Sequence, residues 1–161
     1  MASAKPRTES AYQRHAWIVL LVLGILHTVS GLFVLLAGVD TGEFQNTTGV
    51  AWAEWSAANP TVAPYLRFMV RLMGAGFFGF ALLGTAIALW PFRRGERWAW
   101  YLLWSYPVVL GLTAGILYFQ KVAGLGSFHA GSAILAVVGL LLPLRMFFSQ
   151  SVEANGGEAG Q

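Results

Sequence analysis

The sequence predicts an all-α membrane protein whose chain crosses the bilayer four times as a transmembrane bundle. Three observations favour this fold class. Hydrophobic residues make up 57% of the 161 positions and charged residues only 11%, whereas soluble domains carry about 25% charged residues. Four apolar stretches are each long enough to cross a hydrocarbon core of about 30 Å. Most Lys and Arg residues lie at one end of these stretches, which is typical of the cytoplasmic side.

The first predicted span covers 16–39 and follows a polar, basic N-tail, residues 1–15, that we expect in the cytoplasm. Its apolar run is longer than the roughly 7–15 residues of a signal-peptide core, so we interpret it as a retained helix. Gly24, Gly31 and Gly38 recur every seven residues and form one stripe of this helix. Because small residues let helices approach closely, the stripe is expected to face the other spans.

The only long connection, residues 40–64, is acidic and contains no Lys or Arg. We predict one short helix within it, capped by Thr47 or Thr48. Trp52 and Trp55 would share a face of this helix, which is typical of a segment lying at the level of the lipid headgroups.

The other three spans are predicted at about 66–90, 98–119 and 127–148. Pro107 lies inside the third span and predicts a kink there, because proline cannot donate a backbone hydrogen bond. Residues 149–161 are polar and glycine-rich, and we expect a disordered C-tail.

The distribution of basic residues predicts the orientation of the chain. Three basic residues lie in the N-tail, and Arg93, Arg94 and Arg97 lie between the second and third spans. Cytoplasmic loops are enriched in such residues. We therefore expect a multi-pass protein of the cell membrane, with both termini in the cytoplasm and loop 40–64 outside.

Two arginines near the outer end of the second span oppose this bias. Arg67 and Arg71 lie one helical turn apart, and an arginine facing lipid at depth costs about 3 kcal/mol on the insertion scale. Arg67, at the interface, fits a side chain that extends to the headgroups. For Arg71 we weigh an ion pair with Glu43 or Glu54 against a role in binding a carboxylate, a phosphate or a quinone-like oxygen.

His27 and Ser30 in the first span, and His129 at the start of the fourth, lie on faces rich in small residues. Ionisable residues inside spans are functional candidates, so we predict an inward polar pocket in the outer leaflet. Each histidine has a structural alternative: His27 as a packed, hydrogen-bonded residue, and His129 as a residue that meets water. The candidate ligand-binding residues are Arg71, His27, His129, Arg67, Ser30, Glu54 and Glu43.

Several function classes find no support in the sequence. Cysteine is absent, which excludes thiolate metal sites and disulfides. His27, His129 and Glu54 lack the close spacing of metal ligands, so no metal site is predicted. Neither a nucleotide-binding loop nor a nucleophile motif is present, so no cofactor is expected and no catalytic residue is assigned. The basic residues form no patch suited to nucleic acid.

The run RRGERWAWY at 93–101, followed by Trp104 and Pro107, resembles a pattern found in small four-helix bacterial membrane proteins of unknown function. The whole chain is similar in architecture to the DoxX-like four-helix proteins. Arg71 and the glycines within 74–76 match the DoxX-like signature, while its terminal lysine is missing. The resemblance implies a four-helix bundle in a bacterial inner membrane and assigns no functional residue.

From these observations we expect a non-enzymatic integral membrane protein. It would bind a lipid-like or other small amphiphilic ligand in the pocket, or act as an accessory subunit of a membrane complex. The alternative is a small membrane enzyme acting on a lipophilic substrate, with His27 or His129 as general acid–base and Arg71 stabilising an anion. Expected partners are membrane lipid and, through Gly111 and Gly115, further copies of the chain or a larger complex.

Overall fold

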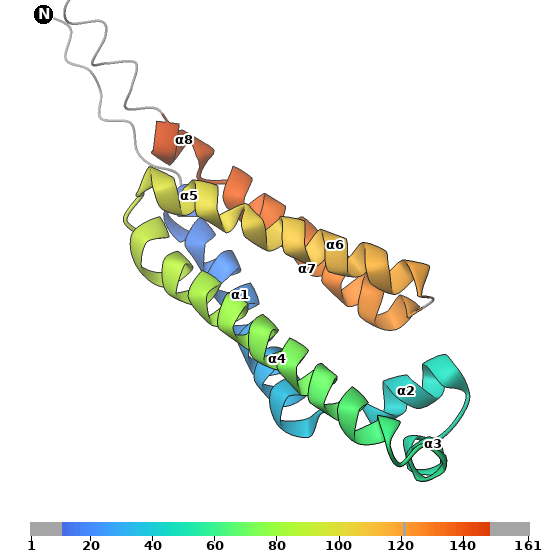
Figure 1. Ribbon diagram of the computed structural model, residues 1–161. Coiled ribbons are helices and arrows are strands. Elements are labelled where there is room, and N and C mark those ends of the chain that lie inside the picture. The colour runs from blue at the N-terminus through green and yellow to red at the C-terminus, as the bar shows by residue number, and fades with distance from the viewer. Residues whose placement is uncertain (1–10, 121, 149–161) are drawn as a thin grey trace, which may run out of the picture.

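The chain folds into helices joined by short turns, without a β-strand, throughout the part that the computed structural model describes, residues 11–120 and 122–148 (Figure 1). This confirms the all-α class predicted from the sequence. The predicted C-tail and most of the predicted N-tail lie outside the described residues.

Four helices are long and apolar enough to cross a membrane. Each overlaps one of the four predicted stretches. The sequence could predict them because a long uninterrupted apolar run is a strong signal for a membrane-spanning helix. They are His15–Ala37, Val62–Phe92, Arg97–Phe119 and Gly124–Leu141.

The helices α1 (Ala11–Ala37) and α4 (Val62–Ile87) lie side by side and make the most extensive contact between two elements. The three glycines of the predicted stripe, Gly24, Gly31 and Gly38, are buried against α4. The prediction that this stripe faces another span is confirmed.

Two glycines determine how closely α1 and α4 approach. A Cβ atom added to Gly31 would lie 2.7 Å from the backbone of Phe78, and one added to Gly74 would lie 2.5 Å from the backbone nitrogen of Leu35. Since carbon atoms in contact prefer a separation of about 3.5–4.0 Å, a larger residue at either position would push the two backbones apart.

Two short helices, α2 (Thr41–Thr48) and α3 (Trp52–Ala58), fill the connection for which one helix beginning at Thr47 or Thr48 was predicted. Thr48 ends α2 instead of starting a helix. The reason is Gly49, whose φ of 75° is the left-handed conformation that terminates helices.

The start of α2 follows from a capping pattern in the sequence. Oδ1 of Asp40 accepts the backbone N–H groups of Gly42 and Glu43. An aspartate followed three residues later by a glutamate is a helix-start signal. Here the N-cap of the helix is Asp40, seven residues before the predicted cap at Thr47.

An aromatic cluster joins α2 to α3. The rings of Trp52 and Trp55 stack with their centroids 5.4 Å apart, and Phe44 meets both of them edge-on. The prediction that the two tryptophans share a face is confirmed.

The α4 helix continues into a π-helical turn, η1 (Ala88–Phe92), and a tight turn leads to α5 (Arg97–Leu103) and α6 (Ser105–Phe119). The third predicted span is therefore interrupted at Trp104. Pro107 explains the position, because proline offers no N–H to the carbonyl four residues before it and its ring crowds that carbonyl.

The last long helix, α7 (Ala123–Leu141), is followed by the short α8 (Leu144–Phe148). Together they occupy the stretch predicted as one span at 127–148. The helix begins four residues earlier than predicted, and Pro143 interrupts it near its end, again because a proline cannot continue the backbone hydrogen bonding.

The long helices form two pairs, α1 with α4 and α6 with α7, and α7 also contacts α1. Figure 1 shows the pairs close together beside α5 and α8, which we call the closed end, and diverging toward α2 and α3, the open end. Nε1 of Trp100 donates a hydrogen bond to the carbonyl of Leu140, and Nε of Arg97 donates one to the carbonyl of Phe147. These two bonds connect α5 to α7 and α8. The core includes Leu20, Leu23, Ile87, Phe92, Leu103, Leu110 and Leu140.

Candidate functional site

His27 of α1 and His129 of α7 meet between the two helix pairs, with their ring centroids 6.0 Å apart. His27 is 0% exposed and His129 8% exposed. The two histidines that the sequence placed on inward faces are therefore brought together, although 101 residues separate them.

The position of each histidine follows from helical periodicity. His27 lies three residues after Gly24 and four before Gly31, so it shares the stripe that faces the interior. On α7, His129 shares a buried face with Ser132 and Ala136. Both side chains are thus directed inward by the faces on which they lie.

Both rings have the same hydrogen bond. Nδ1 of His27 lies 2.8 Å from the carbonyl oxygen of Leu23, and Nδ1 of His129 lies 2.9 Å from that of Leu125. A carbonyl oxygen only accepts, so each Nδ1 carries a proton and donates it. In a neutral imidazole the other nitrogen, Nε2, is then an acceptor.

The Nε2 atom of His27 is the critical atom of this site. It is buried, and among the described residues it has no hydrogen-bond partner. Leaving a buried polar atom without a partner costs about 1–3 kcal/mol. A charged ring would cost more in these surroundings, because buried charges need a counter-charge. His27 is therefore best described as a neutral imidazole whose buried Nε2 is an acceptor.

Tyr106 of α6 adds a hydroxyl group that the sequence analysis did not identify. Its ring lies edge-on to His27 at 5.8 Å, and within the described chain its buried hydroxyl also has no hydrogen-bond partner. Gly84 of α4 makes room for it, since a Cβ there would lie 2.7 Å from Cε2 of Tyr106. A tyrosine in mid-span, away from the aromatic belt at the interface, was the signal that could have revealed it.

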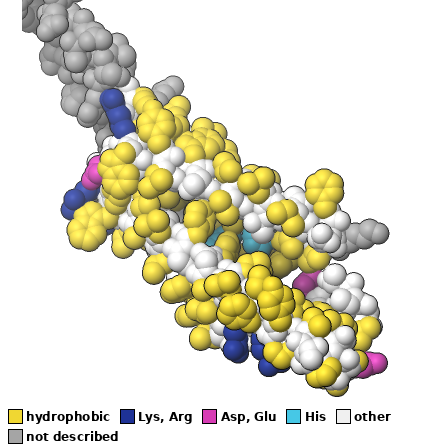
Figure 2. All heavy atoms as spheres, viewed as in Figure 1, with side chains coloured by type: hydrophobic (Ala, Val, Ile, Leu, Met, Phe, Trp, Pro, Cys, Tyr) yellow, Lys and Arg dark blue, Asp and Glu magenta, His cyan; other side chains and the backbone are white. Residues whose placement is uncertain are grey.

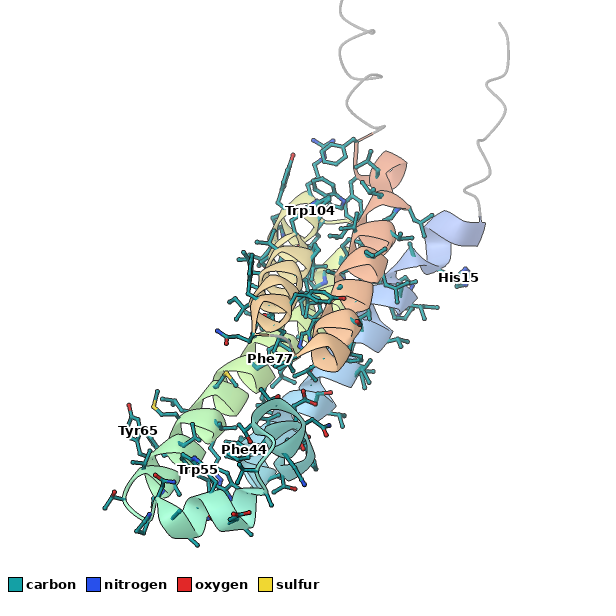
Figure 3. All side chains as sticks on the ribbon, turned by 90° about the vertical axis from the view of Figure 1, so that its right-hand side faces the viewer. His15, Phe44, Trp55, Tyr65, Phe77 and Trp104 are labelled. Carbon is teal, nitrogen blue, oxygen red and sulfur yellow. The ribbon has the colours of Figure 1, made fainter. Side chains whose placement is uncertain are left out.

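Aromatic rings enclose the histidines. Phe77 and Phe128 have ring centroids 5.7 Å and 5.5 Å from that of His27, and Phe80 stacks on Tyr106 at 5.3 Å. Figure 3 shows Phe77 where the α6–α7 pair ends beside α1 and α4. In Figure 2 histidine atoms are visible on the floor of a recess between the two helix pairs.

The two predicted arginines lie elsewhere. Nη2 of Arg71 donates to the carbonyl of Leu36 at 3.2 Å, and the guanidinium of Arg67 lies 5.8 Å from the ring centre of Trp52. Leu36 is nine residues beyond His27, which is about 13 Å along α1. The predicted polar pocket is thus divided into a histidine pair and an arginine pair.

The remaining candidates join neither pair. The hydroxyl of Ser30 donates to the carbonyl of Leu26 on its own helix. The backbone N–H of Glu43 is bound by the cap of α2, and Glu54 is exposed in the first turn of α3. Within residues 11–120 and 122–148, Arg71 binds a backbone carbonyl and not the carboxylate of either glutamate.

The described residues contain no group of three or more His, Cys, Asp or Glu side chains that could hold a metal ion. Neither the known protein families, nor the characterised proteins, nor the solved structures contain a match to this chain. The similarity to DoxX-like proteins accordingly stays a prediction, and function is inferred from the geometry of the site alone.

Proposed function

We propose that the protein is a multi-pass membrane protein whose four long helices form one bundle, and that it binds a small lipophilic ligand between the α1–α4 and α6–α7 pairs. The observation that carries this proposal is the buried Nε2 atom of His27, which lacks a partner among the described residues and belongs to a ring whose centroid is 6.0 Å from that of His129. A ligand in the recess would supply the missing hydrogen bond once one of the aromatic rings that now cover this atom moves aside.

The surface of the molecule supports the membrane assignment. Large apolar side chains such as Phe33, Leu36 and Leu83 are more than half exposed along the helices, and hydrophobic side chains cover most of the face in Figure 2. Soluble monomers rarely expose apolar patches of this extent.

Charge supports an orientation with both termini in the cytoplasm. Arg93 and Arg94 lie at the closed end, where their guanidinium groups cover the rings of Trp17 and Trp90. Cationic residues beside tryptophans are typical of a cytoplasmic membrane interface. In this orientation α2 and α3 lie outside, at the level of the headgroups, with the stacked tryptophans of α3 as interfacial anchors.

The chemistry of the site narrows the ligand class. The buried Nε2 atom of His27 accepts a hydrogen bond, so the ligand must donate one. Tyr106 can donate or accept, and Phe77 and Phe128 offer flat apolar surfaces. A small aromatic alcohol, of the phenol or hydroquinone class, matches both requirements. The recess lies between helix pairs, a place where ligand sites in helical bundles commonly form.

Binding is favoured over catalysis because the predicted catalytic partners are separated. An acid–base mechanism with anion stabilisation needs a cation near the histidines. Arg71 is bound to the carbonyl of Leu36, about 13 Å along α1 from His27 by the helical rise. The histidines therefore support recognition of a ligand without an adjacent cation to stabilise an anion.

A second candidate is a metal ion held by Nε2 of His27 and Nε2 of His129. The observation favouring it is that both rings donate Nδ1–H to backbone carbonyls, as metal-ligating histidines usually do. Stable sites generally need three or four ligands, and the described residues contain no group of three or more His, Cys, Asp or Glu side chains that could hold a metal ion. The organic ligand therefore ranks first.

Native mass spectrometry of the protein released gently from its own membrane tests the proposal. We expect a defined small-molecule adduct on the unmodified chain that His27→Leu and His129→Leu abolish. His15→Leu is the matched control, because His15 is exposed and lies at the closed end of α1. An adduct mass equal to a metal ion would favour the second candidate, and a bare chain in all four samples would refute both.

A further inference from the structure

The arginine pair at the open end carries a second, independent inference. Arg67 and Arg71 are both exposed, and Figure 2 shows two basic side chains next to each other where α4 begins. Both lie against the same residue: a Cβ at Gly38 would be 3.1 Å from Cγ of Arg67 and 3.4 Å from Nε of Arg71. The two cationic groups are thus gathered at the end of α1.

Their hydrogen-bonding capacity is largely unused. A guanidinium group has five N–H donors, and among the described residues Arg71 donates to a single acceptor, the carbonyl of Leu36. One face of Arg67 covers Trp52, which leaves the N–H groups at its edge. Among the described residues neither side chain is bound to a carboxylate; Asp40, the nearest acidic residue to Gly38 along the chain, caps α2.

The depth of the pair follows from helix length, given the proposed membrane orientation. Trp17 and Trp90 mark the headgroup level at the closed end, where Arg93 and Arg94 cover their rings. Twenty helical residues, which span about 30 Å, extend from Trp17 to the last turn of α1, where Arg71 binds. Arg71 therefore lies at the outer edge of the hydrocarbon, and Arg67, one turn earlier, at the headgroups.

We propose that Arg67 and Arg71 together bind the phosphate group of an anionic phospholipid in the outer leaflet. Guanidinium edges match phosphate oxygens in geometry and form charge-assisted hydrogen bonds with them. Two cationic charges need a net negative headgroup, because a zwitterionic headgroup brings its own ammonium. The lipid compensates an arrangement that otherwise opposes the positive-inside bias.

The test is native mass spectrometry of the full chain reconstituted with equal amounts of phosphatidylglycerol and phosphatidylcholine. We expect the most strongly retained lipid to be phosphatidylglycerol, favoured by about tenfold or more, which corresponds to one charge-assisted hydrogen bond. The double variant Arg67→Gln/Arg71→Gln should lose this preference. Arg71→Lys, which keeps the charge and loses the forked geometry, should reduce it.

The matched control is Arg93→Gln/Arg94→Gln, which removes two exposed arginines that also cover aromatic rings, at the opposite end. It should keep the preference. An equal loss in both double variants would overturn the proposal, because any interfacial arginine would then suffice. Displacement of the lipid by inorganic phosphate would also overturn it, since the site would then take free phosphate.

The lipid-binding proposal and the proposed ligand site at the histidines can be refuted independently of each other. His27→Leu should leave the phosphatidylglycerol preference unchanged, and the double arginine variant should leave the adduct at the histidines unchanged. Circular dichroism during heating of both variants verifies that each remains folded. If the folded arginine variant retains phosphatidylglycerol like the unmodified chain, the headgroup assignment is wrong whatever the histidines bind.

Discussion

At the scale of single residues, two hydrogen bonds determine the chemistry of the interior. Because His27 and His129 each donate Nδ1–H to the carbonyl one turn earlier, the helices themselves select the tautomer and direct an acceptor, Nε2, away from the backbone. A ligand that only accepts hydrogen bonds has nothing to gain from these rings, whereas a hydroxyl group or a cation does.

Nitrogen NMR of the histidine-labelled protein in lipid should show this tautomer directly. We expect His27 and His129 to have a protonated Nδ1 and an unprotonated Nε2, while the exposed His15 serves as a comparison from outside the buried pair. Addition of a phenol should shift the Nε2 resonances of the buried pair. Protonation of Nε2 instead of Nδ1 would contradict the proposed site.

Tyr106 provides a second residue-scale test. Its hydroxyl is buried and forms no hydrogen bond within the described chain, so removing it should not weaken the folded state. Tyr106→Phe should leave the unfolding free energy, measured by denaturant titration in detergent, unchanged or higher by up to about 1 kcal/mol. A loss of more than about 1 kcal/mol would mean that the hydroxyl has a partner in the folded protein.

At the scale of helices, the contact between α1 and α4 depends on positions where backbones meet. Gly74 faces the backbone of Leu35, whereas Gly76, two residues further along α4, has open space around it. The two glycines therefore have opposite roles although they lie on one helix. The first permits close approach, and the second only lowers helix propensity.

The substitution Gly74→Ala should thus lower the unfolding free energy by about 1–3 kcal/mol, as overpacking does. The control, Gly76→Ala, should be neutral or raise stability by up to about 1 kcal/mol, because alanine is the better helix former. Thermal unfolding in the same detergent compares the two. Equal effects would show that the close approach at Gly74 does not determine the packing.

The sequence predicted the positions of these helices better than it predicted which residues of different helices are in contact. Apolar length and the glycine stripe are local signals, so the four long helices and the inward direction of His27 could be predicted. The register between α1 and α4 is not local: it places Arg71 beside Leu36, away from the histidines. Tyr106 carries a local signal, its place in mid-span, but its contact with His27 is not local, since only the folded chain brings the two rings together.

At the scale of the whole molecule, the two ends differ in both shape and charge. The closed end carries Arg93, Arg94 and Arg97, and α5 is fastened there to α7 and α8. The open end carries α2 and α3 with their acidic residues, together with the arginine pair. Orientation in the membrane therefore decides which leaflet would supply both the ligand proposed for the recess and the lipid proposed for Arg67 and Arg71.

The absence of cysteine from the sequence makes this orientation directly measurable. Thr47→Cys in α2 and Arg94→Cys at the closed end each introduce a single thiol at an exposed position. With both termini in the cytoplasm, a membrane-impermeant maleimide should label Cys at 47 in intact cells, and label Cys at 94 only after permeabilisation. The reverse pattern would refute the orientation and place the arginine pair in the cytoplasmic leaflet, where anionic lipids are abundant. Phosphatidylglycerol binding by the pair would then survive as a property of that leaflet.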